Sequence, residues 1–152
     1  MHSFLLPSFT KGMKSFELSG FSYSDCGSSC DTFNIIYIDE PAKLNPADFS
    51  NAIFYYNKKR YDFTIWIDTD DLTPEISKLL SESGFAVAGT EPVMLLDLKS
   101  YTPVKIEEEK NISRLVTIKD YENFGLITSK NWEPPDLNVI DFYLRVSHTT
   151  IK

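Results

Sequence analysis

The sequence predicts an α/β fold. Aromatic and β-branched residues dominate three segments in the manner of strands: Phe33–Ile38, Phe63–Ile67 and Val93–Leu98. Two segments between them begin with a proline and carry an apolar stripe, which predicts helices over Pro46–Lys58 and Pro74–Ser83. Strands that alternate with helices along the chain indicate a sheet flanked by helices.

The composition favours a folded protein and disfavours two classes of partner. Hydrophobic residues make up 42% of the 152 residues, which is enough for a core and argues against wholesale disorder. The net charge of −7 argues against nucleic acid, because phosphate binding needs a basic surface. No segment resembles a signal peptide or a transmembrane helix, so we expect a cytoplasmic protein with no membrane partner.

The first thirty residues give the weakest signal. Polar residues dominate them, and glycine and serine mark turns at Ser19-Gly20 and at residues 27–29. Phe16–Leu18 is interpreted as a short strand. The next segment, Phe33–Ile38, is apolar on both faces, which predicts a central strand covered from both sides.

Local capping signals define the two helices that follow. Asn45 is a favourable N-cap and Asp48 suits the positive end of the helix dipole. The apolar stripe of this helix comprises Phe49, Ala52, Ile53 and Tyr56. In the second helix, Gly84 can adopt the left-handed conformation that ends a helix, and Phe85 can then fold back on Leu80.

A second unit is predicted after an acidic linker at residues 106–110. Ile112–Val116 reads as a short strand, and Thr117 with Asp120 forms a capping box for a helix that runs to about Asn131. Two prolines interrupt the chain at 134–135 before a last helix at residues 136–146.

The last helix is apolar on more than one side. One side can dock on the preceding helix, while Val139, Phe142 and Val146 lie on another and need a different partner. We therefore expect these residues either to mediate a homodimer or to pack back on the sheet of the first module.

The end of the second predicted helix resembles the GNAT N-acetyltransferase superfamily. In that family a helix commonly ends in Leu-Tyr-x-x-x-Gly-Phe before a strand, and here the matching residues are Leu79-Leu80-Ser81-Glu82-Ser83-Gly84-Phe85, before Val93–Leu98. Asp31–Asn34 also resembles a pattern in proteins built from two GNAT-like modules. The resemblance implies a mixed, largely antiparallel sheet and acetyl transfer from acetyl-CoA to an amine in the complete protein.

The same resemblance implies a division of the chain. Residues 1–105 are similar to a degenerate first module, and residues 111–152 to the opening strand and helices of a second, incomplete module. A non-catalytic binding or scaffolding module that has kept the fold is the alternative. The acceptor substrate and the natural length of the protein stay open.

Two departures from the family pattern predict that this chain is inactive alone. The family holds the cofactor pyrophosphate on a glycine-rich loop, whereas the corresponding turn, DEPAKLNPAD at residues 39–48, has no glycine, and Asp39 and Glu40 would repel phosphate. The tyrosine that serves as general acid is Leu80 here. Tight binding of acetyl-CoA is therefore not expected, no catalytic residue is assigned, and any chemistry would depend on residues beyond Lys152.

Candidate substrate-binding residues are Trp66, Asp68, Asp70 and Trp132. The aspartates follow a strand, where open α/β sheets often bind ligands, but they can equally favour the dipole of the next helix. The tryptophans can line a cleft between modules or serve packing. Cys26 and Cys30 lack nearby histidines, so no metal site is predicted and both cysteines are expected to be free or buried.

Overall fold

The computed structural model describes residues 12–92, 99, 102 and 113–150 and divides the chain into two units. The first unit comprises Met1–Thr73 with Leu115–Lys152, and the second comprises Pro74–Arg114. The strand expected over Val93–Leu98 and the linker expected at residues 106–110 lie outside the described residues.

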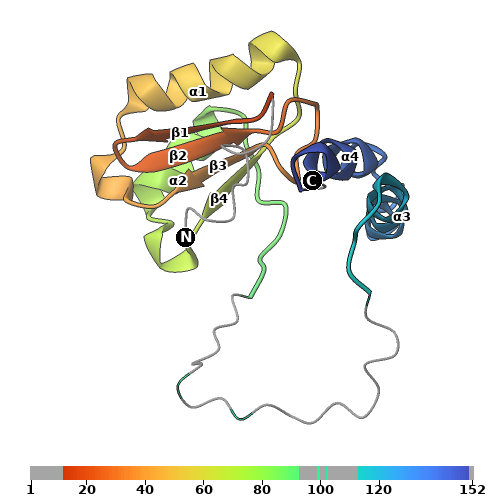
Figure 1. The fold of residues 1–152 in the computed structure, drawn as a ribbon. Coiled ribbons are helices and arrows are strands. Elements are labelled where there is room, and N and C mark those ends of the chain that lie inside the picture. Colours follow the sequence, from red (N-terminus) through yellow and green to blue (C-terminus); the bar gives the residue numbers. More distant parts are fainter. Residues whose placement is uncertain (1–11, 93–98, 100–101, 103–112, 151–152) are drawn as a thin grey trace. The chain divides into compact units, whose positions relative to one another are not determined.

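The first unit contains a mixed sheet of four strands in the order β1-β2-β3-β4 (Figure 1). The strands are β1 (Lys14–Leu18), β2 (Phe21–Asp25), β3 (Ile35–Ile38) and β4 (Thr64–Ile67). β2 is antiparallel to β1 and to β3, and β4 is parallel to β3. The predicted α/β class is confirmed, and β2 is a strand that the sequence interpretation missed.

A tight turn at Gly20 joins β1 to β2. Gly20 has φ +84°, which L-residues rarely adopt, and a Cβ there would lie 2.6 Å from the Leu44 nitrogen. The Gly20 carbonyl accepts hydrogen bonds from the backbone N–H groups of Asp39 and Glu40. The expected turn at Ser19-Gly20 thus also positions the chain that follows β3.

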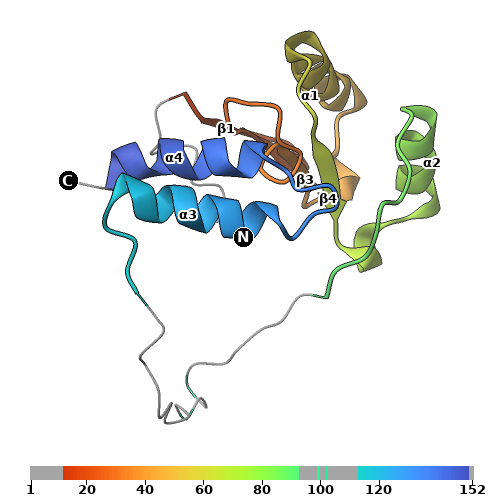
Figure 2. The same cartoon turned by 90° about the vertical axis from the view of Figure 1, so that its right-hand side faces the viewer.

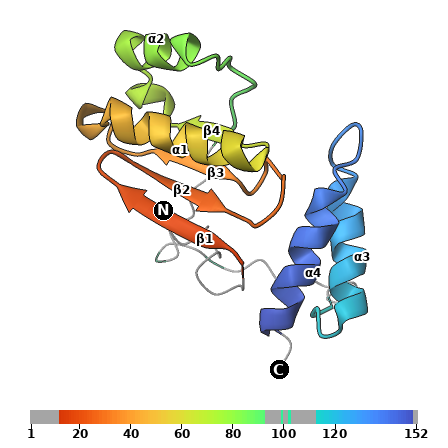
Figure 3. The ribbon, with the colours of Figure 1, turned by 90° about the horizontal axis from the view of Figure 1, so that it is seen from above.

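Helix α1 (Pro46–Lys59) connects β3 to β4 and covers one face of the sheet (Figure 3). The Asn45 side chain accepts hydrogen bonds from the N–H groups of Ala47 and Asp48, as the sequence predicted. The helix buries three of the four residues of the predicted stripe, and they are Phe49, Ala52 and Tyr56. They pack in the core together with Phe21, Ile36 and Ile38.

The second unit contains α2 (Pro74–Glu82). Gly84 has φ +87°, and the Phe85 N–H donates to the Leu80 carbonyl at 3.0 Å. This is the helix-ending geometry that the residues LLSESGF predict.

The capping box before α3 (Ile118–Ser129) is confirmed. The Asp120 N–H donates to the Thr117 hydroxyl, and the Asp120 carboxylate accepts from the Thr117 N–H at 2.8 Å. The strand predicted over Ile112–Val116 is wrong for residues 113–116, which pair with none of the four strands. The Val116 N–H donates instead to the same Asp120 carboxylate at 3.0 Å, so the cap takes a donor that a strand would need.

Helices α3 and α4 (Asn138–Thr150) lie side by side (Figure 2). α4 begins and ends later in the chain than the segment predicted at residues 136–146. Gly125 permits a close approach, since a Cβ there would lie 2.9 Å from the Ile140 Cα. Among the described residues, every helix is too short or too polar to cross a lipid bilayer.

α4 also packs back on the N-terminal part of the chain. Val139 and Phe142 are buried in a cluster with Met13, Cys26 and Cys30, and Val146 packs against it. The helix was expected to pack on the sheet of the first module, but the residues that it contacts lie beside the strands, in the loop between β2 and β3 and just before β1. The homodimer stays a prediction.

Candidate functional site

The predicted substrate-binding residues fall in two places within the first unit. Trp66 is 44% exposed on β4, Asp68 follows that strand, and Asp70 lies in the short 3-10 helix after it. The Tyr37 hydroxyl donates to the Asp68 carboxylate at 3.3 Å, and burial together with that carboxylate raises the pKa of Tyr37. Trp132 lies in the connection between α3 and α4, beside residues that precede β4, so it does not join the other three.

The turn before α1 is where the family resemblance would place the cofactor pyrophosphate. A short 3-10 helix, Pro41–Lys43, occupies it, and Lys43 forms an exposed ion pair with Glu40 at 2.5 Å. The Asn45 side chain accepts from Ala47 N–H at 2.9 Å and from Asp48 N–H at 3.4 Å. The donors that an anion would use at this helix N-terminus are therefore already engaged, and the Asp48 carboxylate adds a negative charge.

Trp132 lines an acidic hollow of about 340 Å³. Its walls come from the loop between β2 and β3, from Asp62 before β4, and from the connection between α3 and α4 with the first residue of α4. The lining residues are Ser29, Cys30, Asp31, Asp62, Trp132, Glu133, Pro134, Asp136 and Asn138.

Hydrogen bonds reach three of the four carboxylates that line the acidic hollow, and Asp31 accepts one from the Thr32 hydroxyl at 3.5 Å. Asp62 accepts from the Ser29 hydroxyl at 2.7 Å, and Asp136 accepts from the N–H and the side-chain amide of Asn138 at 2.9 and 3.0 Å. No lysine or arginine belongs to the lining. Four carboxylates beside an indole ring suit a cationic group and repel an anion.

The carboxylates of the acidic hollow do not converge on a point. Across the described ranges, no group of three or more histidine, cysteine, aspartate or glutamate side chains is placed to hold a metal ion. The hollow thus offers negative charge to a cationic group, and its described residues do not have the geometry of a metal centre.

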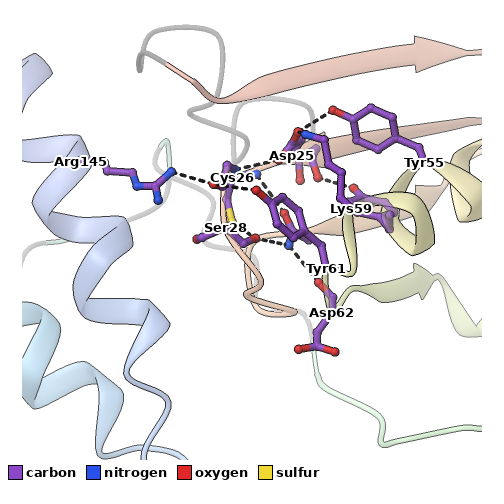
Figure 4. Close-up of polar contacts among 12 residues, drawn as sticks. Asp25, Cys26, Ser28, Tyr55, Lys59, Tyr61, Asp62 and Arg145 are labelled. Carbon is purple, nitrogen blue, oxygen red and sulfur yellow. Dashed lines mark hydrogen bonds and ion pairs between the residues drawn. The ribbon is translucent and has the colours of Figure 1, made fainter.

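A second polar cluster lies at the end of β2 (Figure 4). The carboxylate of Asp25, which is fully buried, accepts from the Gly27 N–H at 2.7 Å and from the Tyr55 hydroxyl at 2.5 Å, and it forms an ion pair with Lys59. The Lys59 ammonium also lies 4.6 Å from the centre of the Tyr55 ring. This cluster ties β2 to the last turn of α1.

The charges of this cluster are stable at neutral pH. Burial raises the pKa of Asp25, but the hydrogen bonds from Lys59, Tyr55 and Gly27 outweigh it, so the pKa lies below the ordinary value. Burial lowers the pKa of Lys59, while its hydrogen bonds to Asp25 and Tyr55 raise it by more. Both groups are therefore charged near pH 7, and their ion pair links β2 to α1.

The loop between β2 and β3 is held in shape from within and from α4. The Asn34 side chain accepts from the Cys26 N–H at 2.9 Å and donates to the carbonyls of Ser28 and Asp62 at 2.8 and 2.9 Å. Arg145 on α4 donates to the Gly27 carbonyl at 2.9 Å (Figure 4). The same loop thus forms one wall of the acidic hollow and part of the surface on which α4 packs.

Sequence reasoning identified Trp132 but missed its acidic surroundings and the cluster at Asp25. The alternation in Phe21–Asp25 was an available signal for β2, and with it for a carboxylate at the strand end. Nothing local indicated that Asp62 and Asp136 would meet. Comparison of the chain with family models, curated proteins and solved structures finds no match.

Proposed function

We propose that this chain is a non-catalytic binding module with a GNAT-like fold, and that it does not itself hold acetyl-CoA. The observation that carries the proposal is the occupied N-terminus of α1. Asn45 engages two of the N–H groups there, and the preceding turn contains two acidic residues, a proline and no glycine. A pyrophosphate would have to displace the cap and approach Asp39 and Asp48.

A second candidate is that the chain is part of a complete GNAT-family N-acetyltransferase. Two features support it: the helix ending at Gly84-Phe85, and a sheet whose parallel pair, β3 and β4, is joined through a helix after an antiparallel hairpin. In that case acetyl transfer from acetyl-CoA to an amine depends on a module other than the one described here.

Calorimetric titration with acetyl-CoA tests the proposal. We expect no binding tighter than about 10 μM, which corresponds to roughly −7 kcal/mol. Tighter binding would overturn the proposal. The variant Asp48→Lys then locates the site, because an added positive charge at the N-terminus of α1 strengthens binding there. Glu17→Lys, at an exposed residue outside the hollow, is the matched control with the same change of charge.

The acidic hollow is the feature of the first unit that suits a ligand of such a module. Its four carboxylates and the Trp132 ring select organic cations, such as primary amines, over anions. The chain has two tryptophans, so the variant Trp66→Phe leaves Trp132 as the only fluorescent indole.

In that background, an alkyl diamine is expected to change Trp132 emission at millimolar concentration, and an alkyl dicarboxylate of equal length is not. Asp31→Asn combined with Glu133→Gln should weaken the diamine response several-fold, while Asp70→Asn combined with Asp71→Asn, with the same loss of charge outside the hollow, should not. An equal change of Trp132 emission with both ligands would show that the hollow is not a cation site. The homodimer and the cytoplasmic location stay predictions.

A further inference from the structure

Both cysteines of the chain lie under α4. Cys26 and Cys30 are each 1% exposed and share a cluster with Val139 and Phe142 of that helix. The Cys26 thiol donates to the Ser28 carbonyl at 3.3 Å, and the Cys30 thiol lies 3.6 Å from the Asp136 carboxylate. Each residue is thus almost fully covered while α4 is in place, and Cys30 also lies in the wall of the acidic hollow.

The docked state also suppresses the reactive form of both thiols. Burial raises the pKa of Cys30 to about 12, helped by the negative charge of Asp136, and burial raises the pKa of Cys26 as well. The thiolate is the nucleophile in disulfide exchange. Burial and protonation therefore both slow the reaction of the thiols with a disulfide.

The loop that carries the thiols is also what holds α4. Phe142 stacks on Phe33 with ring centres 3.6 Å apart, and Arg145 donates to the Gly27 carbonyl at 2.9 Å. A group attached to the Cys26 sulfur would need space inside the buried cluster that Val139 and Phe142 help to fill.

We propose that docking of α4 and covalent modification of Cys26 exclude one another, so that reaction of this thiol with small disulfides controls the position of α4. In the undocked state a cysteine thiolate attacks one sulfur of a low-molecular-weight disulfide. A mixed disulfide forms, the original S–S bond breaks, and the other half leaves as a thiolate that takes up the proton lost by the cysteine. Because only the undocked state reacts, modification shifts the population towards it. This device does not depend on the proposed binding function.

The first test measures thiol labelling by an aromatic disulfide reagent. In the native protein we expect labelling at least about 100-fold slower than in denaturant, because reaction requires opening. Phe142→Ala should accelerate native labelling at least tenfold. Ile127→Ala, at an α3 residue that is 69% exposed, is the matched control and should leave the rate unchanged.

Arg145→Met separates undocking from unfolding, since it removes the bond to Gly27 and keeps most of the side-chain volume. It should accelerate labelling several-fold with an unchanged circular dichroism spectrum. Native labelling at the rate of a free thiol, or no acceleration in both Phe142→Ala and Arg145→Met, would overturn the proposal. Cys26→Ser and Cys30→Ser assign the rate to each sulfur.

The second test reads the position of α4 directly. In the Trp66→Phe background, Trp132 packs against the thiol cluster and reports on docking. Protein carrying a glutathione mixed disulfide, refolded from denaturant, should show Trp132 emission that differs from that of the unmodified protein and should regain the unmodified emission on reduction. Unmodified Trp132 emission in fully modified protein would also overturn the proposal.

Discussion

Helices α1 and α4 are attached to the same unit by different physics. α1 is tied to β2 by the ion pair of the buried Asp25 with Lys59, and by the Tyr56 hydroxyl, which donates to the Ser24 carbonyl. α4 is held by a stacked pair of phenylalanines and by buried apolar and thiol groups, with Arg145 as its polar link to the loop.

The attachment of α1 thus depends on charge, whereas the attachment of α4 depends on packing. The joint at α1 requires an ionised carboxylate and therefore responds to acid. The joint at α4 contains no buried carboxylate of this kind, so it should respond to changes of shape instead. The following predictions try to break this distinction, beginning with the largest expected effect.

Phe142→Ala should destabilise the protein most. It removes a ring that is 7% exposed and stacked on Phe33. The loss of such a buried ring lowers the free energy of unfolding by about 3–4 kcal/mol. Urea denaturation followed by circular dichroism measures the free energy of unfolding. Phe54→Ala, at a position 64% exposed on α1, should change it by less than about 0.5 kcal/mol. Equal effects at the two positions would contradict the packing of α4 described here.

Asp25→Asn should cost somewhat less, about 2–3 kcal/mol. The substitution keeps the shape of the side chain but leaves the Lys59 ammonium without its counter-charge and weakens the bond to Tyr55. The same denaturation experiment applies, with the exposed Asp31→Asn as control. A neutral result would show that the charge at Asp25 is not what holds α1.

Acid should distinguish the two joints. The pKa of Asp25 in the folded state lies below its ordinary value of 3.8, so the stability that its charge contributes is present above that value and is lost as the pH falls through the folded-state pKa. The difference in unfolding free energy between the wild type and Asp25→Asn should shrink as the pH is lowered below about 4. The corresponding difference for Phe142→Ala should stay constant. A parallel pH dependence of both differences would remove the distinction.

The smallest effect is expected at the cap of α1. Asn45→Ala removes two hydrogen bonds to the first turn and should cost about 1 kcal/mol. Asn45→Gly should cost only a few tenths of a kcal/mol, because glycine tolerates the N-cap conformation. Thermal unfolding of both variants measures the contrast, and an alanine variant as stable as the wild type would mean that the cap contributes nothing to folding.

The sequence by itself determined the elements whose signals are local. Asn45 with Pro46 marked the start of α1, Thr117 with Asp120 marked the start of α3, and Gly84 marked the end of α2. In each case the capping residue and the backbone group to which it bonds lie a few positions apart in the sequence. A short stretch of sequence is therefore enough to predict the interaction. β2 escaped because its serines resemble a turn, although its alternation was visible.

Only the tertiary structure decided where those elements meet. Arg145 reaches the Gly27 carbonyl across 118 residues, and the Cys30 thiol reaches Asp136 across 106. An apolar stripe indicates that one face of a helix is buried, but it does not indicate which residues cover that face. The sequence of α4 was therefore equally consistent with a dimer and with packing inside its own chain. The acidic hollow arises in the same way, because Asp62 and Asp136 carry no mutual signal until the loop between β2 and β3 and α4 are packed together.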